Sequence, residues 1–242
     1  MSGSKNLCSD QTCTHTETSQ QSQVTAGRDR AAALTIDVVS DVICPWCFIG
    51  KRRLEKALLL LGNPATVQVV WRPFQLNPQM PAQGIERRAY RIAKFGSWER
   101  SLALDAKVAE AGRGEGIDFA FDMMTRTPST LDAHRLIWLA QKNGVQDAVV
   151  ETLFRAYFED GLDLNDRLTL LALAVRSGIP APDAERLLAG DEGRAEVLNE
   201  EARFKSIGMS GVPSFFINGE IAFSGAVEPS FLADAIRQAL RG

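Results

Sequence analysis

The sequence LTIDVVSDVICPWC, residues 34–47, joins a short apolar run to two cysteines that are separated by two residues. The run 34–39 is rich in β-branched side chains, which is typical of a buried strand. The residues after the cysteines, up to Leu61, are typical of a helix, and the sequence GNP at 62–64 is a strong stop signal. The pattern therefore predicts a strand, a turn that carries a dithiol, and a helix that begins at about Pro45.

The position of the first cysteine at the start of a helix indicates redox chemistry. Free backbone N–H groups and the positive end of the helix dipole meet there and favour a thiolate, so Cys44 is the candidate nucleophile. Cys47 lies one turn further on, and we expect it to be more buried and to resolve mixed disulfides. Pro45 and Trp46 between the cysteines, and Asp41 before them, are candidates for tuning the dithiol. Asp41 is equally well explained as a turn or cap residue.

Further along the chain, strand and helix signals alternate in a recognisable order. Residues 67–72 form a second predicted strand, so the order β-α-β implies a parallel pair of strands. Near the C-terminus, residues 214–217 and 220–224 flank an Asn-Gly dipeptide, the strongest short signal for a β-hairpin. A final helix is predicted over 229–240.

The region from about Gly84 to Ser206 carries no convincing strand, and its apolar residues recur at helical spacing. We predict five to seven helices there, one of them capped by Ser129 or Thr130. The fold class is therefore α/β, with the order β-α-β, a large all-helical insertion, and β-β-α. Residues 34–82 and 207–242 form one α/β domain in this interpretation, and residues 83–206 form the helical insertion domain.

Composition restricts the possible partners and compartment. The chain has 242 residues and a net charge of −3, which gives no reason to expect nucleic acid or an anionic membrane as a partner. It has no apolar run of the roughly 20 residues needed to cross a bilayer. Residues 1–33 are polar, with no apolar signal-peptide core, so we expect a disordered N-terminal tail and a cytoplasmic protein. Paired cysteines in a reducing compartment indicate catalysis or metal binding.

The predicted tail carries a second pair of cysteines, Cys8 and Cys13, with His15 nearby. The pair is an auxiliary redox pair for Cys44 and Cys47, a weak metal clip, or an unremarkable mobile pair, and the sequence favours the last. A zinc site built from all four cysteines is a further alternative, but residues 14–43 make a longer gap than usual zinc ribbons have. We therefore expect no metal.

Four stretches together resemble the DsbA-like branch of the thioredoxin superfamily. They are SDVICPWCFIGKRR at 40–53, RPFQLNP at 72–78, DAHR at 132–135 and GVPSF at 211–215. The sequence is most similar to the FrnE-type dithiol oxidoreductases, which are related to 2-hydroxychromene-2-carboxylate isomerases and kappa-class glutathione transferases. The resemblance implies a thioredoxin fold over about residues 34–240, with a helical insertion.

The same resemblance implies a substrate-binding role for Val212 and Pro213. In such folds the Gly-Val-Pro loop faces the dithiol and its proline is cis. Because Pro213 has no N–H, the backbone of Val212 is expected to pair with an extended peptide. The alternative is an ordinary turn proline before the strand at 214–217.

Three functions remain open at this point. The first is a dithiol–disulfide oxidoreductase or isomerase that acts on protein thiols, with no cofactor but with glutathione as a potential redox partner. The second is a glutathione-dependent isomerase or transferase of small molecules, whose relatives typically have serine where this chain has Cys44. The third is a binding or chaperone module. Substrate, direction of electron flow, redox potential and oligomeric state are left open, although related families often form homodimers.

Other polar residues near these motifs have simpler interpretations. Lys51, Arg52 and Arg53 are expected to form a solvated face of the helix. His134 is interpreted as a structural histidine and Asn77 as the start of an Asx turn, with roles near the site as the alternatives.

Overall fold

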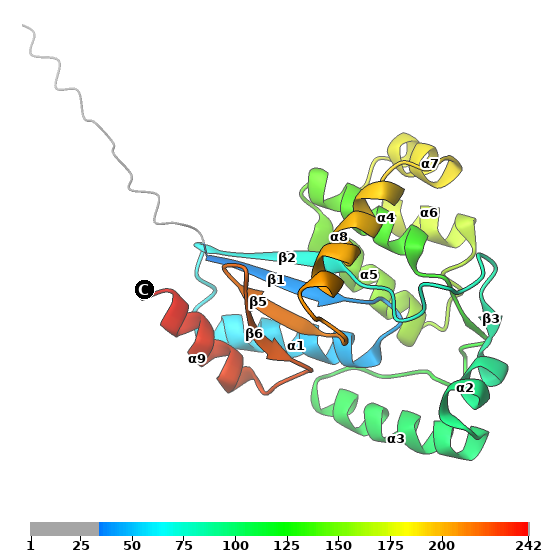
Figure 1. Ribbon diagram of the computed structural model, residues 1–242, viewed down its shortest axis with the longest axis horizontal. Helices are drawn as coiled ribbons and strands as arrows, with labels where there is room; N and C mark the ends of the chain where they lie inside the picture. The colour runs from blue at the N-terminus through cyan, green and yellow to red at the C-terminus, as the bar shows by residue number, and fades with distance from the viewer. Residues whose placement is uncertain (1–33, 242) are drawn as a thin grey trace, which may run out of the picture. The chain divides into compact units, whose positions relative to one another are not determined.

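The computed structural model describes residues 34–241, and a four-stranded sheet lies at the centre of this part of the chain (Figure 1). The strand order is β2-β1-β5-β6. The bounds are Leu34–Ser40 for β1, Val67–Pro73 for β2, Ser214–Ile217 for β5 and Glu220–Ser224 for β6. β1 runs parallel to β2 and antiparallel to β5, and β5 and β6 form the hairpin. The predicted parallel pair and the predicted hairpin are both confirmed.

β1 is buried in the middle of the sheet, as its β-branched, mainly apolar residues indicate. Ile36 pairs with Val69 on one side and with Ile217 on the other. Ile36 and Val38 are at most 1% exposed. Its polar residues Thr35 and Asp37 alternate with buried apolar ones but are only partly exposed, and Asp37 accepts from Arg72 of β2 at 2.6 Å.

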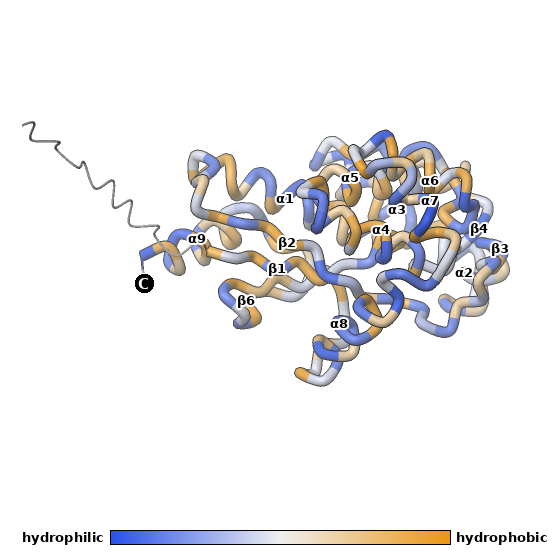
Figure 2. The backbone as a smooth tube through the Cα atoms, turned by 90° about the horizontal axis from the view of Figure 1, so that it is seen from above, coloured by the Kyte–Doolittle hydropathy of each residue, from blue (hydrophilic) through white to orange (hydrophobic). Residues whose placement is uncertain are grey.

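Helices cover both faces of the sheet. α1 (Pro45–Leu60) and α9 (Pro229–Ala239) pack against each other, and Figure 2 shows α8 (Arg194–Ser206) on the opposite side of the sheet from α1. This is the thioredoxin arrangement that the resemblance implies. It places the start of α1 at the end of β1.

The segment between β2 and β5 is mainly helical. In the described chain it contains seven helices, which are α2 (Arg87–Phe95), α3 (Trp98–Gly114), α4 (Leu131–Lys142), α5 (Gln146–Phe158), α6 (Arg167–Arg176), α7 (Ala181–Ala189) and α8. The predicted number of five to seven helices is confirmed. Thr130 occupies the N-cap position of α4, but its hydroxyl caps no backbone N–H.

The expectation of no strand in this segment is wrong in one detail. β3 (Ile85–Glu86) and β4 (Arg126–Thr127) form an antiparallel pair of two residues each. Strands this short have no periodicity to recognise, and the pairing arises only when the chain folds back over 40 residues of sequence separation.

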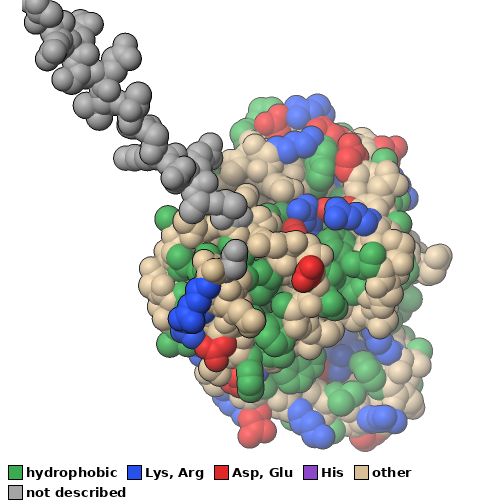
Figure 3. Space-filling view, turned by 60° about the vertical axis from the view of Figure 1, so that its left-hand side comes forward, with side chains coloured by type: hydrophobic (Ala, Val, Ile, Leu, Met, Phe, Trp, Pro, Cys, Tyr) green, Lys and Arg blue, Asp and Glu red, His purple; other side chains and the backbone are tan. Residues whose placement is uncertain are grey.

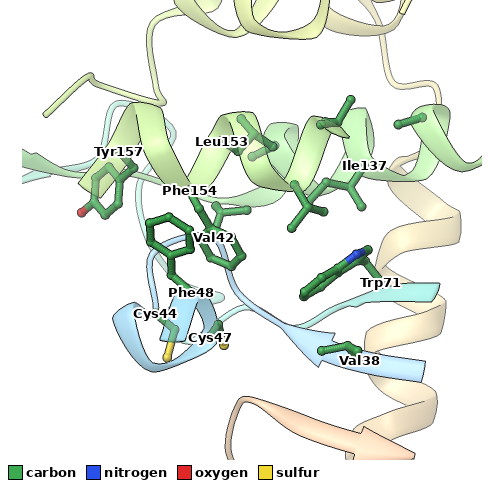
Figure 4. Close-up of a cluster of buried hydrophobic side chains, with 14 of the residues drawn as sticks. Val38, Val42, Cys44, Cys47, Phe48, Trp71, Ile137, Leu153, Phe154 and Tyr157 are labelled. Carbon is green, nitrogen blue, oxygen red and sulfur yellow. The ribbon is translucent and has the colours of Figure 1, made fainter. Parts of the chain in front are cut away.

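The helical segment and the sheet share one hydrophobic core. Phe48 of α1 stacks on Phe154 of α5 with ring centroids 5.1 Å apart, and Trp71 of β2 meets Phe154 edge-on (Figure 4). Phe48 and Phe154 are fully buried. Because the two parts share a core, packing does not mark a boundary between them. The predicted division into domains at residues 83 and 206 therefore stays a prediction from the order of the elements.

The surface mixes apolar and charged side chains. Figure 3 shows acidic and basic groups interspersed with hydrophobic ones on the face turned toward the viewer. Over residues 34–241, no helix combines the length and the hydropathy that a membrane span requires. The predicted tail and its cysteines, Cys8 and Cys13, lie outside the described residues.

Candidate active site

The dithiol lies at the junction between β1 and α1, where the sequence places it. Cys44 is the N-cap residue of α1 in extended conformation, and Pro45 occupies the first turn. The Cys44 N–H donates to the Asp41 carbonyl at 3.0 Å, and the Cys47 N–H donates to the Cys44 carbonyl at 3.0 Å. Proline suits this position because the first helical N–H groups have no intrahelical partner. No acidic side chain in the first turn opposes a negative charge there.

The two cysteines differ in accessibility. Cys44 is 6% exposed and Cys47 is 0% exposed, so the expected difference in burial is found, although the outer thiol is itself shielded. Both cysteines are free thiols, and Figure 4 shows both sulfurs on the side of the first turn away from Phe48. Trp46, between them, is 41% exposed and forms part of the outer surface.

The Cys47 thiol is held in its neutral form. Burial raises the pKa of Cys47 well above its ordinary value, and the neighbouring Cys44 sulfur raises it further. Hydrogen bonds from the Ser40 side chain and the Asp41 backbone act in the opposite direction and are weaker. Cys47 must therefore lose a proton before it can act as a nucleophile.

The Gly-Val-Pro loop lies against the outer thiol. The Val212–Pro213 peptide bond is cis, as the resemblance implies, and the Cys44 S–H donates to the Val212 carbonyl at 3.7 Å. A substrate strand that pairs with this carbonyl would displace the contact. Pro213 packs closely on α1, since a Cβ added to Gly50 would lie 3.0 Å from Pro213 Cγ.

Asp41 is fully buried beside the dithiol. Its backbone contacts both cysteines, whereas its carboxylate turns elsewhere: Oδ2 accepts the Leu76 N–H at 2.7 Å. Oδ1 lies 3.4 Å from His134 Nε2 and has no well-aligned donor in the described chain. Asp41 thus has more than a turn role, and its function in proton transfer stays a prediction.

A cavity of about 340 Å³ opens beside Cys44 and Trp46. Its wall is mainly apolar and aromatic, with Phe95, Phe121 and Tyr157 among the lining residues. Burial is the main cause that raises the pKa of Tyr157. The phenol therefore stays neutral at physiological pH.

Basic side chains outnumber acidic ones in the lining of this cavity. Four are basic and one is acidic: Arg87, Arg91, Lys94, Lys107 and Asp105. Asp105 accepts from Arg87 at 2.7 Å and also pairs with Arg91. Lys107 is exposed. The cavity therefore combines an apolar interior with a net positive charge, which suits an anionic group attached to an apolar body.

The expectation of a solvated basic face after the motif is wrong. The Lys51 side chain is 3% exposed and pairs with Asp147 at 3.2 Å and Glu151 at 3.3 Å of α5. Arg53 donates to Glu115 at 2.7 Å. The helical segment packs over this side of α1 and supplies the acids, which the sequence of α1 alone cannot reveal.

Asn77 has a partner that the sequence did not indicate. The Tyr90 hydroxyl donates to Asn77 Oδ1 at 2.7 Å, and Lys94 donates to the same hydroxyl at 2.7 Å. Asn77 thereby connects the loop after β2 to α2. The residues at 87, 90, 91 and 94 share one face of α2 at helical spacing. The helical spacing of these residues indicates from the sequence that they share a face. No local sequence pattern, however, indicates that this face lies next to the dithiol.

Comparisons with known proteins agree with this architecture. The profile of the family described as the DSBA-like thioredoxin domain matches residues 35–237. A probable DsbA oxidoreductase, SCO1869 from Streptomyces coelicolor, is 31% identical with a TM-score of 0.77, covering 85% of this chain and 89% of that chain.

Two further relatives are more distant. The uncharacterized protein YwbO from Bacillus subtilis is 24% identical over 204 residues, 83% of this chain and 94% of its own. The cytosolic disulfide reductase DsbM from Pseudomonas aeruginosa, solved with GSH, is 18% identical with a TM-score of 0.62, covering 86% of this chain and 100% of that chain. The extent of the family match decides the assignment: this chain belongs to the DSBA-like thioredoxin domain family.

Proposed function

We propose that this protein is a FrnE-type thiol–disulfide oxidoreductase or isomerase that acts through Cys44 and Cys47. The observation that carries the proposal is the unequal burial of two free thiols on one helical turn. Of the two cysteines, only Cys44 is partly accessible, so it meets the substrate first. Cys47 is positioned to act on what Cys44 has captured.

The reaction proceeds in two exchanges. The Cys44 thiolate attacks a substrate disulfide R–S–S–R′, a bond forms between Cys44 and the sulfur of R, and R′–S⁻ leaves and takes up a proton. Cys47 then loses its proton and attacks Cys44. The Cys44–Cys47 bond forms, and the sulfur of R leaves and is protonated. The substrate gains two electrons and the dithiol loses two.

In a reducing cytoplasm such a pair rests in its reduced form and works as a reductase or isomerase of misoxidised protein thiols. The likeness to a protein described as a cytosolic disulfide reductase supports this direction and compartment. Glutathione serves as the redox partner that returns the pair to the dithiol. In this account Trp46 and the Val212–Pro213 loop contact the substrate, Pro45 fixes the start of α1, and Asp41 assists proton transfer.

The test is reduction of insulin and refolding of scrambled ribonuclease by the wild type, Cys44→Ala and Cys47→Ser. We expect Cys44→Ala to be inactive in both assays. Cys47→Ser should accumulate a mixed disulfide with the substrate through Cys44, which mass spectrometry of the intact protein detects. Equal activity of Cys44→Ala and wild type would leave only a binding or chaperone role.

The auxiliary role of the second cysteine pair is tested in the same assays. If Cys8 and Cys13 pass electrons to Cys44 and Cys47, the variant Cys8→Ser/Cys13→Ser loses turnover with an external reductant but retains single-turnover exchange. Unchanged turnover would remove that role.

A second function is favoured by the cavity beside Cys44. An apolar pocket with excess basic charge suits a glutathione-dependent isomerase or transferase acting on a small acid. In that case Cys47 is not needed, so turnover of an aromatic acid with glutathione should survive Cys47→Ser. The double variant Lys94→Ala/Lys107→Ala should raise KM for the acid more than it lowers kcat. Loss of all activity in Cys47→Ser favours the dithiol mechanism.

A further inference from the structure

Asp41 connects the dithiol to the loop after β2. Its carbonyl accepts the Cys44 N–H at 3.0 Å, and its backbone also hydrogen-bonds to the Cys47 thiol. Its carboxylate accepts the Leu76 N–H at 2.7 Å through Oδ2. Any change in the position of this buried carboxylate is therefore transmitted to the turn that carries both sulfurs.

His134 approaches the other carboxylate oxygen from the helical segment. It lies in α4 and is 3% exposed. Its Nε2 is 3.2 Å from the Phe74 carbonyl, which can only accept, so Nε2 carries a hydrogen. The same Nε2 lies 3.4 Å from Asp41 Oδ1, an oxygen that has no well-aligned donor in the described chain. The His134 N–H is thus placed between a backbone carbonyl and a buried carboxylate.

We propose that His134 is a positioning residue for thiol–disulfide exchange: its Nε2–H holds the Asp41 carboxylate and thereby sets the reactivity of the Cys47 thiol. This inference rests on the proposed dithiol mechanism. It assigns the helical segment a part in the chemistry of the thioredoxin-like fold. The sequence favours a structural histidine at this position, with a role near the site as the alternative.

The physical reason is the cost of a buried carboxylate without donors. With leucine in place of His134, Oδ1 would lose the one N–H that lies within 3.4 Å of it in the described chain, and a buried charge without that polar neighbour must rotate away or take up a proton. Either response moves or discharges the residue whose backbone contacts Cys47. The other ionisable groups around Asp41 do not replace the lost donor. Tyr157 of α5 has its pKa raised chiefly by burial, is affected in addition by the charges of Arg87 and Asp41, and donates to the Arg126 carbonyl instead.

The experiment observes the reaction of Cys44 and the reaction of Cys47 as two successive kinetic phases. Reduced protein in the Cys8→Ser/Cys13→Ser background is mixed with the aromatic disulfide dithiobis(nitrobenzoate) in a stopped-flow instrument. The first nitrobenzoate thiolate released reports attack by Cys44, and the second reports resolution by Cys47. The redox equilibrium with glutathione is measured on the same proteins.

Three variants are compared with this background protein. His134→Leu removes the donor. His134→Gln keeps a side-chain N–H near the position of Nε2. Gln146→Leu is the matched control, since Gln146 is also a buried polar residue that joins the helical segment to β2, by bonds of 2.9 and 3.0 Å to Trp71.

We expect His134→Leu to slow the second release at least tenfold and to leave the first within about threefold. Its equilibrium constant with glutathione should change about tenfold, which is about 30 mV. His134→Gln and Gln146→Leu should stay within about threefold of the background protein in both phases. The proposal is wrong if His134→Leu resolves as fast as the background protein, if both His134 variants are slowed alike, or if Gln146→Leu is slowed as much as His134→Leu. Absence of the first release would instead refute the dithiol mechanism itself.

Discussion

At the scale of single residues, the burial of Cys47 makes the stability of the reduced protein depend on pH. The folded state raises the pKa of this thiol above its ordinary value of 9.0, chiefly by desolvation. The stabilisation that belongs to the protonated form is then complete below pH 9 and is lost as the pH rises toward the folded pKa. The loss is at most about 1.4 kcal/mol for each pH unit above 9.

This pH dependence is checked by urea unfolding of reduced wild type and Cys47→Ala between pH 7 and 10. The free energy of unfolding of the wild type should fall more steeply above pH 9 than that of the variant. Other groups titrate in both proteins, so the difference isolates Cys47. Parallel curves of the free energy of unfolding against pH would show that burial does not raise the pKa of Cys47.

Gly50 is a second residue with a measurable role, because it lets α1 approach Pro213. A methyl group there would lie 3.0 Å from Pro213 Cγ and 3.4 Å from Phe215. We expect Gly50→Ala to lower the free energy of unfolding by about 1–3 kcal/mol. Gly114→Ala at the end of α3 is the control, since nothing lies within 4 Å of its added methyl group. Equal stabilities of the two variants would mean that α1 and the loop are less closely packed than described.

At the scale of elements, α1 and α5 are joined by an asymmetric charge cluster. Lys51 is buried, whereas its partners Asp147, Glu55 and Glu151 are 65%, 40% and 25% exposed. Removing the cation leaves acids that water can solvate. Removing the acids leaves a buried ammonium group without partners, which is the costly direction.

We therefore predict that Lys51→Met changes the free energy of unfolding by less than about 1 kcal/mol. The triple variant Glu55→Gln/Asp147→Asn/Glu151→Gln should lose about 3 kcal/mol or more. Adding Lys51→Met to the triple variant should recover most of that loss, as measured by a thermodynamic cycle from urea unfolding. A triple variant as stable as the wild type would show that Lys51 is hydrated.

The helices and strands also show which parts of the structure local sequence patterns could predict. The buried β1, the helix that starts at Pro45 and the Asn-Gly hairpin all follow from local signals, and all are found. β3 and β4 could not be predicted from the sequence, because a strand of two residues has no periodicity of apolar side chains. The cavity and the partners of Lys51 and His134 depend on which helix faces pack together, and that information is not local to any motif.

At the scale of the whole molecule, the helical segment completes both the core and the site. Phe48 is fully buried because Phe154 and Phe158 cover it, and Trp71 is 3% exposed. We predict that a chain in which a short linker replaces residues 83–206 does not unfold cooperatively on heating and binds an apolar dye. Cooperative unfolding of the shortened chain would instead support residues 34–82 and 207–242 as an independent domain.

The homodimer stays a prediction, which light scattering of the full chain checks.

The central claim is that Cys44 and Cys47 exchange between a dithiol and a disulfide as one unit. It is tested most directly by equilibrating the Cys8→Ser/Cys13→Ser protein in glutathione buffers and counting alkylated thiols by mass spectrometry. We predict a single two-electron transition in which both cysteines become unreactive together. Two thiols that remain alkylatable at every ratio, or that form only separate glutathione adducts, would contradict the account.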